Sequence, residues 1–225
     1  MSSNAFAGLG SRLYIQQLNP ATPPVGKAIS GISKAAPGVV TATSHGLLDG
    51  MLVTISGVAG SAGSMADING SYYAVNVTTN SFSLMTLDGL PVNTSTLAPY
   101  SSGGMVTPAA YLPVPEARSL HFADAASAEI DVTTMLSTSK EYLLGLQDAG
   151  EFSFEMNYVP FDAATVELRQ AKADAQVRGL RIDFHDGSAF ACRAFVKTVP
   201  FQTDYQTAVT GSATLKITGV PLWMP

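Results

Sequence analysis

Hydrophobic and polar residues alternate strictly along several stretches in the second half of the chain. In the clearest stretch, residues 151–158, every even position is apolar and every odd position is polar. A period of two is typical of a β-strand with one face in a core and the other in water. Residues 181–184 and 214–218 repeat the pattern. It predicts half-buried antiparallel strands, in which Arg181 and Asp183 lie on the polar face.

One stretch in this half has a helical period instead. We predict a helix over residues 163–178, with Asp162 as its N-cap and Gly179 as the left-handed residue that ends it. Its narrow stripe of small and apolar residues consists of Ala164, Leu168, Ala171 and Ala175. Such a stripe lets a helix lie close on a sheet. Asp174 and Arg178 are spaced to add an i,i+4 ion pair worth only a few tenths of a kcal/mol.

The first half of the chain has a different texture. A short strand at residues 11–16 precedes the proline-rich residues 19–24, which interrupt any strand pairing. Residues 29–107 then contain 21 Ser or Thr, 11 Gly and only four charged residues. Strand-length β-branched or aromatic runs cover residues 39–43, 52–55, 72–77 and 81–84, separated by turn-forming pairs at 45–46, 49–50, 69–70 and 79–80. We predict a small all-β domain at 29–107, inserted into a discontinuous domain of residues 1–28 and 108–225.

Residues 133–150 are neither strand-like nor simply polar. A capping box of Thr138 and Glu141 predicts one short helical turn here. The apolar members of this loop are Met135, Leu136, Tyr142, Leu143, Leu144 and Leu146. Leaving them in water is unfavourable, so either another subunit covers them or the loop folds back on its own core.

Composition favours an assembly protein. Only 13% of the residues are charged, mean hydropathy is +0.21, and no run approaches the ~18 apolar residues that a membrane span requires. A chain so poor in charge is expected to hide surface in subunit contacts and to insert into no membrane. The first residues lack a basic region followed by an apolar one, so we expect synthesis in a cytoplasm.

Candidate chemistry is sparse. The net charge of −5 has no basic stripe, which disfavours tight binding of nucleic acid. The single cysteine, Cys192, is expected to be buried, and the His185-Asp186-Gly187 sequence is expected to be a hairpin turn. No metal, nucleotide or protease motif occurs, and Glu151 and Glu155 are roughly 13 Å apart on one strand, too far for a glycosidase pair. We predict no enzyme, no cofactor and no metal.

A known family resembles the second half of the chain. Residues 130–162 read IDVTTMLSTSKEYLLGLQDAGEFSFEMNYVPFD. The IDVT start, the DAGE turn and the FSFEMNYVP strand are similar, in this order, to the signature of siphophage major tail tube proteins. Residues 39–58 and 68–84 resemble a small β-barrel-like module found in many phage tail proteins, but this second resemblance implies no activity.

The resemblance implies a mainly β fold: a tail-tube β-sandwich with one flanking helix. It also implies a virion protein whose hexameric rings stack into a tube for genome delivery, with the apolar loop reaching the neighbouring ring and the inserted domain outside. A tape measure protein, tail terminator and tip proteins, and double-stranded DNA passing without specific binding would be its partners. The polar face with Glu151 and Glu155 is then either an ordinary solvated face or the lumen, where carboxylates repel phosphates.

Two other functions stay open at this point. One is a tail-tip or decoration subunit that binds a host surface glycan through residues 29–107, which would be present in few copies per particle. The other is a hydrolase of cell-wall polymers, which would need a carboxylate pair in a cleft.

Overall fold

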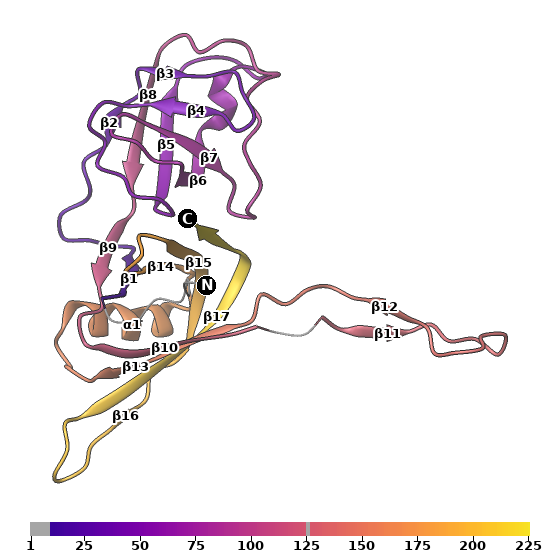
Figure 1. Ribbon diagram of the computed structural model, residues 1–225. Coiled ribbons are helices and arrows are strands. Elements are labelled where there is room, and N and C mark those ends of the chain that lie inside the picture. Colours follow the sequence, from indigo (N-terminus) through magenta and orange to yellow (C-terminus); the bar gives the residue numbers. More distant parts are fainter. Residues whose placement is uncertain (1–9, 125–126) are drawn as a thin grey trace, which may run out of the picture.

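The computed structural model describes residues 10–124 and 127–225 (Figure 1). It is 45% strand and 7% helix, so the predicted mainly β class with one α-helix is confirmed for the described residues. All strand pairs within its three sheets are antiparallel. No helix in the described part of the chain combines the length and apolar character needed to cross a membrane.

The large sheet has eight strands in the order β10-β13-β17-β15-β14-β1-β9, with β16 also paired to β17. Its strands are β1 (Arg12–Gln17), β9 (Ala110–Pro113), β10 (Ala117–Ala123), β13 (Glu151–Asn157), β14 (Arg178–Asp183), β15 (Ala189–Thr198), β16 (Phe201–Gln202) and β17 (Thr210–Met224). Leu13 of β1 and Phe154 of β13 belong to one hydrophobic core although their strands are far apart in this order. The sheet therefore curls around its core, as one continuous sheet.

The alternation predicted for β13 is confirmed. Phe152, Phe154 and Met156 are buried in the core, whereas Glu155 is exposed and Glu151 is half-buried. β13 pairs with β10 on one side and β17 on the other, so its buried residues lie between two other half-buried strands. Both edges of β13 are thus paired and one face is buried, so only the face with Glu151 and Glu155 remains available to other molecules.

Helix α1 (Ala163–Asp174) lies on the core and begins where the sequence predicts. The Asp162 carboxylate accepts hydrogen bonds from the amides of Ala164 and Thr165, at 3.0 and 3.4 Å. The helix ends earlier than predicted, since Ala175 takes the left-handed conformation with φ of 54°. Of the predicted stripe, the buried members are Ala164, Leu168 and Ala171, while Ala175 is exposed.

The assignment of Gly179 as the helix end is wrong, because Gly179 lies inside β14. A Cβ at this position would lie 2.6 Å from Leu52 Cδ1 and 2.8 Å from the Tyr111 hydroxyl. The glycine is therefore required for close packing between segments far apart in the sequence, which a local pattern does not reveal.

A second, seven-stranded sheet forms the upper part of the molecule in Figure 1. It consists of β2 (Lys27–Ala28), β3 (Gly31–Ile32), β4 (Val39–Thr41), β5 (Leu52–Val58), β6 (Gly70–Val75), β7 (Ser81–Met85) and β8 (Gly103–Pro108), with the 3-10 helix η1 (Met65–Ile68) between β5 and β6. All four predicted strand runs form strands here. The pair Asn69-Gly70 is not a tight turn: Asn69 follows η1 and its side chain bonds the Val58 backbone, and Gly70 starts β6.

The two sheets share a small hydrophobic cluster. From the large sheet it contains Ala189, Ala191, Leu222 and Met224, and from the seven-stranded sheet Leu52, Tyr73 and Val75. Beside it, Arg181 Nε donates a 2.8 Å hydrogen bond to the carbonyl of Asp49. The prediction that Arg181 lies on a wet face is thus wrong, because the seven-stranded sheet covers it and leaves it 7% exposed.

The third sheet is the two-stranded hairpin of β11 (Glu129–Asp131) and β12 (Tyr142–Leu144). It belongs to an arm, defined here as residues 127–147, that extends away from the rest of the molecule (Figure 1). The predicted helical turn of Thr138 and Glu141 does not form. The Glu141 carbonyl instead accepts a hydrogen bond from the Val132 amide, and the tip turns at Thr134 and Ser137.

Candidate assembly surfaces

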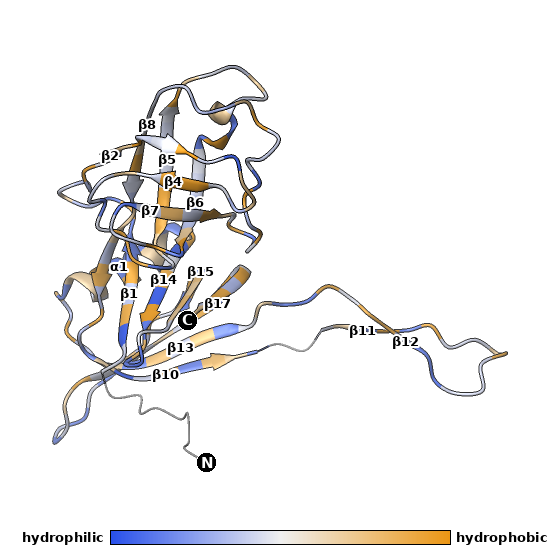
Figure 2. Ribbon diagram, turned by 45° about the horizontal axis from the view of Figure 1, so that its top comes forward, coloured by the Kyte–Doolittle hydropathy of each residue, from blue (hydrophilic) through white to orange (hydrophobic). Residues whose placement is uncertain are grey.

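The six apolar residues predicted to meet another subunit all lie on the arm, and all are exposed. Their exposed fractions are 106% for Met135, 95% for Leu136, 49% for Tyr142, 58% for Leu143, 77% for Leu144 and 95% for Leu146. Figure 2 shows this hydrophobic character along the arm, outside the molecule's own cores. In the single subunit the loop does not fold back on its own core. Burial in another surface would contribute roughly 1.5–3 kcal/mol per large side chain.

The tip of the arm is organised by local hydrogen bonds. The Ser137 amide donates to the Thr134 carbonyl at 3.0 Å, and the Thr134 amide donates to Ser137 Oγ at 3.1 Å. Between them, Met135 and Leu136 form the turn and point their apolar side chains at solvent. The turn thus presents two adjacent apolar side chains at the far end of the arm.

The polar face of β13 carries both predicted carboxylates. Glu151 lies opposite Lys216 and forms a 2.6 Å ion pair with Lys197, from β15. Glu155 lies opposite Ser212, is exposed, and forms no ion pair with a described residue. The face therefore has charges of both signs, and its unpaired negative charge rests on Glu155.

A second ion pair lies at the end of this face. Lys216 Nζ binds the Asp148 carboxylate, and that hydrogen bond holds the pKa of Asp148 below its usual value. Asp148 Oδ1 also accepts from the amide of Gly150, whose φ of 85° places it in the predicted turn before β13. The contact ties the root of the arm to β17.

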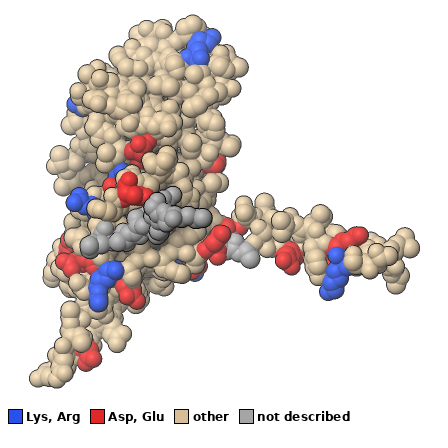
Figure 3. Space-filling model, viewed as in Figure 1, with Lys and Arg blue, Asp and Glu red and all other residues tan. Residues whose placement is uncertain are grey.

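The face of the molecule shown in Figure 3 is almost without charge over the seven-stranded sheet. Acidic and basic side chains gather over the large sheet and on the arm. The charged residues of the arm are Glu129, Asp131, Lys140 and Glu141. The arm is thus acidic, with a net charge of 1 − 3 = −2.

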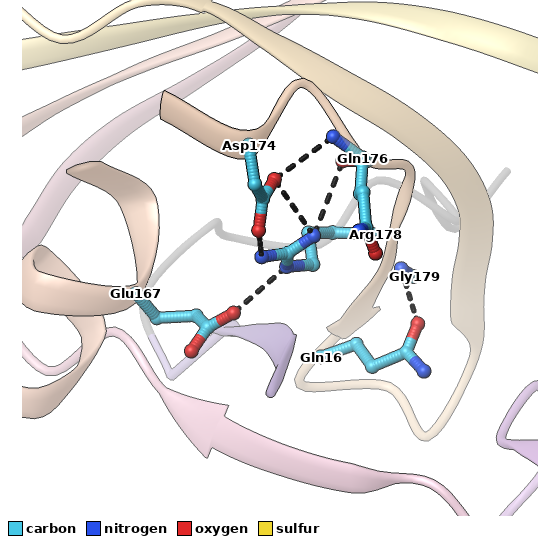
Figure 4. Close-up of polar contacts among 6 residues, drawn as sticks. All are labelled: Gln16, Glu167, Asp174, Gln176, Arg178 and Gly179. Atoms are coloured by element: carbon cyan, nitrogen blue, oxygen red, sulfur yellow. Dashed lines mark hydrogen bonds and ion pairs between the residues drawn. The ribbon is translucent and has the colours of Figure 1, made fainter. Parts of the chain in front are cut away.

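A buried ionic cluster next to α1 is structural (Figure 4). Arg178 is fully buried and binds Glu167 at 2.7 Å and Asp174 at 2.6 Å. Burial disfavours its charged form, but the two carboxylates outweigh that effect and raise the pKa of Arg178. The sequence predicts the Asp174 contact but misses Glu167, which has no pattern that marks it as buried. Nearby, the Gly179 amide donates to Gln16 Oε1 at 2.8 Å.

The remaining sequence candidates have structural roles. The His185-Asp186-Gly187 turn is confirmed, with the Phe184 amide bonded to the Ser188 carbonyl and Gly187 at φ of 93°. Cys192 is buried, and burial raises the pKa of its thiol to about 12. Within residues 10–124 and 127–225, no group of three His, Cys, Asp or Glu side chains is arranged to hold a metal.

Comparison with known proteins gives one strong result. Residues 91–224, which are 134 of the 225 positions, match a family model described as the lambda phage tail tube protein. No curated protein matches the chain. One chain of a cryo-EM structure of the anti-feeding prophage baseplate, 6-fold symmetrised, is similar over 79% of this chain and 94% of its own, with 6% identity and a TM-score of 0.39. That likeness is too weak to support an argument.

The family match covers the arm, its root, β13, α1 and the strands that follow, which are the elements that carry the exposed apolar and polar surfaces. The family is structural and has no catalytic activity. The chain belongs to the lambda phage tail tube protein family and is a structural component of a phage tail.

Proposed function

We propose that the protein is the major tail tube subunit of a long, non-contractile tail. Six copies close into a ring, and the rings stack into the conduit through which the genome enters the host cell. The observation that carries this proposal is the arm, which holds six apolar residues in solvent beyond the subunit's own cores. Such a surface requires a partner, and family membership makes further copies of the chain the natural one.

Ring closure is supported by the edges of the large sheet. β9 and β10 each have only one neighbour among the described strands. Unpaired edges promote association with other strands, and a closed ring of subunits gives each edge a partner.

We place the polar face of β13 toward the lumen. Its residues Glu151, Ser153, Glu155 and Asn157 include no cationic side chain, and Glu155 adds a charge that repels passing DNA. The pairing of Glu151 with Lys197 reduces the field that two free carboxylates would give.

Residues 29–107 form, in this proposal, a separate domain on the outer wall. The support is a hydrophobic core of their own, built around Val40, Ile55, Phe82 and Leu84. A tape measure protein inside the tube, with terminator and tip proteins at its ends, would complete the tail. The alternative is a tail-tip or decoration subunit that binds a host glycan through this domain, and copy number per particle distinguishes the two.

Electron microscopy of negatively stained protein tests the proposal. Purified protein at raised concentration is expected to form rings and tubes. A variant with Leu143→Asp and Leu144→Asp should leave short or unstacked species, because two charges replace apolar contacts between rings. The control, Thr138→Asp with Ser139→Asp, adds the same charge at exposed polar positions of the arm and should still stack. Tubes of normal length from the leucine variant would contradict the stacking role.

A further inference from the structure

A groove on the large sheet lies between β1 and β10. It has a volume of about 850 Å³, and its walls include Arg12 and Tyr14 on one side and Arg118 and Leu120 on the other. A smaller cavity of about 190 Å³ adjoins it, since Leu120 and Phe184 line both. We call the two together the aromatic groove.

The small end of the aromatic groove is strongly apolar. Its lining consists of Leu120, Phe122, Phe152, Ile182, Phe184, Phe190 and Trp223. Trp223 is 65% exposed at this site and lies against Phe190, with ring centroids 4.6 Å apart, and parallel to Phe184 at 6.2 Å. An exposed tryptophan beside an open apolar cavity is typical of a surface that another molecule covers.

The wide end of the groove is basic. Arg12 and Arg118 line it together with no acidic residue, and neither forms an ion pair with a described residue. Both side chains are exposed. Carboxylates lie near both, since Arg12 is opposite Asp183 on β14 and Arg118 lines a neighbouring pocket with Glu155. The groove thus combines two exposed cations with an apolar end.

The arm has the complementary properties. Its strands carry the carboxylates Glu129, Asp131 and Glu141, and its tip carries the exposed pair Met135 and Leu136. Opposite charges favour correct docking, and a flexible methionine packs well against aromatic rings. The 190 Å³ end offers room for a long apolar side chain of the tip.

The arm of a subunit is rooted beside its own aromatic groove. β10 ends at Ala123 and β13 begins at Glu151, each one residue from a phenylalanine that lines the cavity. From this root the arm extends outward in Figure 1, so that its tip lies far from its own groove. Each half of the 21-residue arm has about eleven residues, which reach about 36 Å when extended. The tip is thus placed to meet a different copy, and a head-to-tail contact of this kind propagates.

We propose that Met135 of one subunit enters the apolar end of the aromatic groove of a subunit in the next ring, with Leu136 covering the groove beside it and the acidic strands of the arm beside Arg12 and Arg118. This assignment rests on the proposed stacking of rings, and it adds the receiving surface. Each ring then carries both the apolar tips and the grooves that accept them.

The chain has a single tryptophan, so fluorescence reports on the groove directly. Trp223 emission should shift to shorter wavelength when dilute subunits form tubes, because docking removes the indole from water. The shift should be absent from a Met135→Asp, Leu136→Asp variant and present in the Thr138→Asp, Ser139→Asp control. Tubes that form with unchanged Trp223 emission would overturn the groove assignment and leave the proposed function intact. Wild-type protein that never forms tubes would overturn both.

Cross-linking supplies an independent readout. With Cys192→Ala as background, oxidation of tubes that carry Met135→Cys and Leu120→Cys should give a ladder of linked subunits, whereas Met135→Cys with Gln176→Cys should give none. Absence of the ladder from the first pair in intact tubes contradicts the docking. The groove would belong instead to the chain's own residues 1–9 if Trp223 emission were already at short wavelength in dilute protein and moved to long wavelength on their deletion.

Discussion

Arg178 is the residue on which the packing of α1 most depends. It is a fully buried charge held by Glu167, itself 4% exposed, and by the more accessible Asp174. Breaking a buried pair by removing one partner typically costs 3–5 kcal/mol, since the other charge stays buried without compensation. The cluster thus joins the helix to the start of β14 and specifies where the two meet.

We expect Arg178→Ala to lower the free energy of unfolding by about 3–5 kcal/mol, because Glu167 would keep a buried, unpaired charge. Urea denaturation measures the change. Arg169→Ala, which removes an exposed arginine from the same helix, is the matched control and should cost far less. Equal losses from the two variants would show that the cluster contributes nothing special.

His45 gives the seven-stranded sheet a pH dependence. Its Nδ1 accepts from the Leu47 amide at 3.1 Å, and its ring meets Phe82 edge-on at 5.3 Å. Burial lowers the pKa of His45 below its usual 6.5, so the folded state holds it neutral where the unfolded state is already protonated. The unfolded state then binds more protons, and stability is complete above pH 6.5 and falls as pH drops below it.

Thermal unfolding between pH 7.5 and 5 checks this expectation. The melting temperature of the seven-stranded sheet should fall with pH in the wild type. His45→Asn, whose side-chain oxygen can replace Nδ1 as acceptor, should lose most of that dependence, whereas replacement of the exposed His185 by Asn should preserve it. The same slope in the His45→Asn and wild-type proteins would assign the effect to other groups.

At the scale of elements, the two carboxylates on β13 differ in their ion pairing. Glu151 already has Lys197 at 2.6 Å, whereas Glu155 has no ion pair among the described residues. We expect Glu155→Lys to leave assembly nearly intact and to slow genome release, with partial recovery at high salt, because screening shortens the attraction to phosphate. Release measured with a DNA-binding dye tests this.

The control for that experiment is Glu155→Gln, which removes the negative charge without adding a positive one and should give a smaller delay. Normal release by Glu155→Lys at low salt, or a density map of the tube with this side chain outside the bore, would contradict the lumen assignment.

Sequence patterns predicted the elements whose cause is local. The alternation along β13 and the cap at Asp162 depend on neighbours within a few residues, and both are confirmed. The incorrect predictions depend on residues far away in the sequence. Gly179 is required by close packing against Leu52 and Tyr111, and Arg181 is buried where it bonds the Asp49 carbonyl. The arm's apolar residues could be identified as unusual from the sequence, but the aromatic groove could not, because its lining comes from β1, β10, β13, β14, β15 and β17.

At the scale of the whole molecule, the two sheets have separate cores and a shared seam. The seven-stranded sheet has its own cluster, which includes Val53, Met65 and Val106, whereas Leu222 and Met224 of β17 are buried partly against it. A unit with its own core is expected to fold alone. Because the two sheets share the cluster that contains Leu222 and Met224, removing the seven-stranded sheet exposes apolar surface on the large sheet.

We therefore expect residues 27–108 to fold as an isolated fragment, with a cooperative thermal transition by circular dichroism. Deletion of residues 30–106, closed by a short Gly/Ser linker, should give a protein that still folds and assembles but aggregates more readily. Adding Leu222→Ser and Met224→Ser to the deletion should reduce that aggregation, whereas the same pair in the full chain should destabilise it. An unfolded fragment together with an insoluble deletion, even after the serine changes, would contradict the division into two domains.

The slenderness of the arm affects when a tail begins to grow. Only three residue pairs join β11 to β12, and the arm has no core of its own, so it belongs to the class of hairpins that are marginally stable alone. In a free subunit the hydrogen bonds of the arm open at low free energy. When two free subunits associate, ordering the arm costs conformational entropy. Two free subunits therefore associate poorly. A subunit that meets a complete ring makes several contacts for the same loss of conformational entropy in its arm. Tube growth should therefore begin after a lag, and adding preformed tube ends should remove the lag. The lag keeps free subunits from polymerising in the absence of a tail initiator.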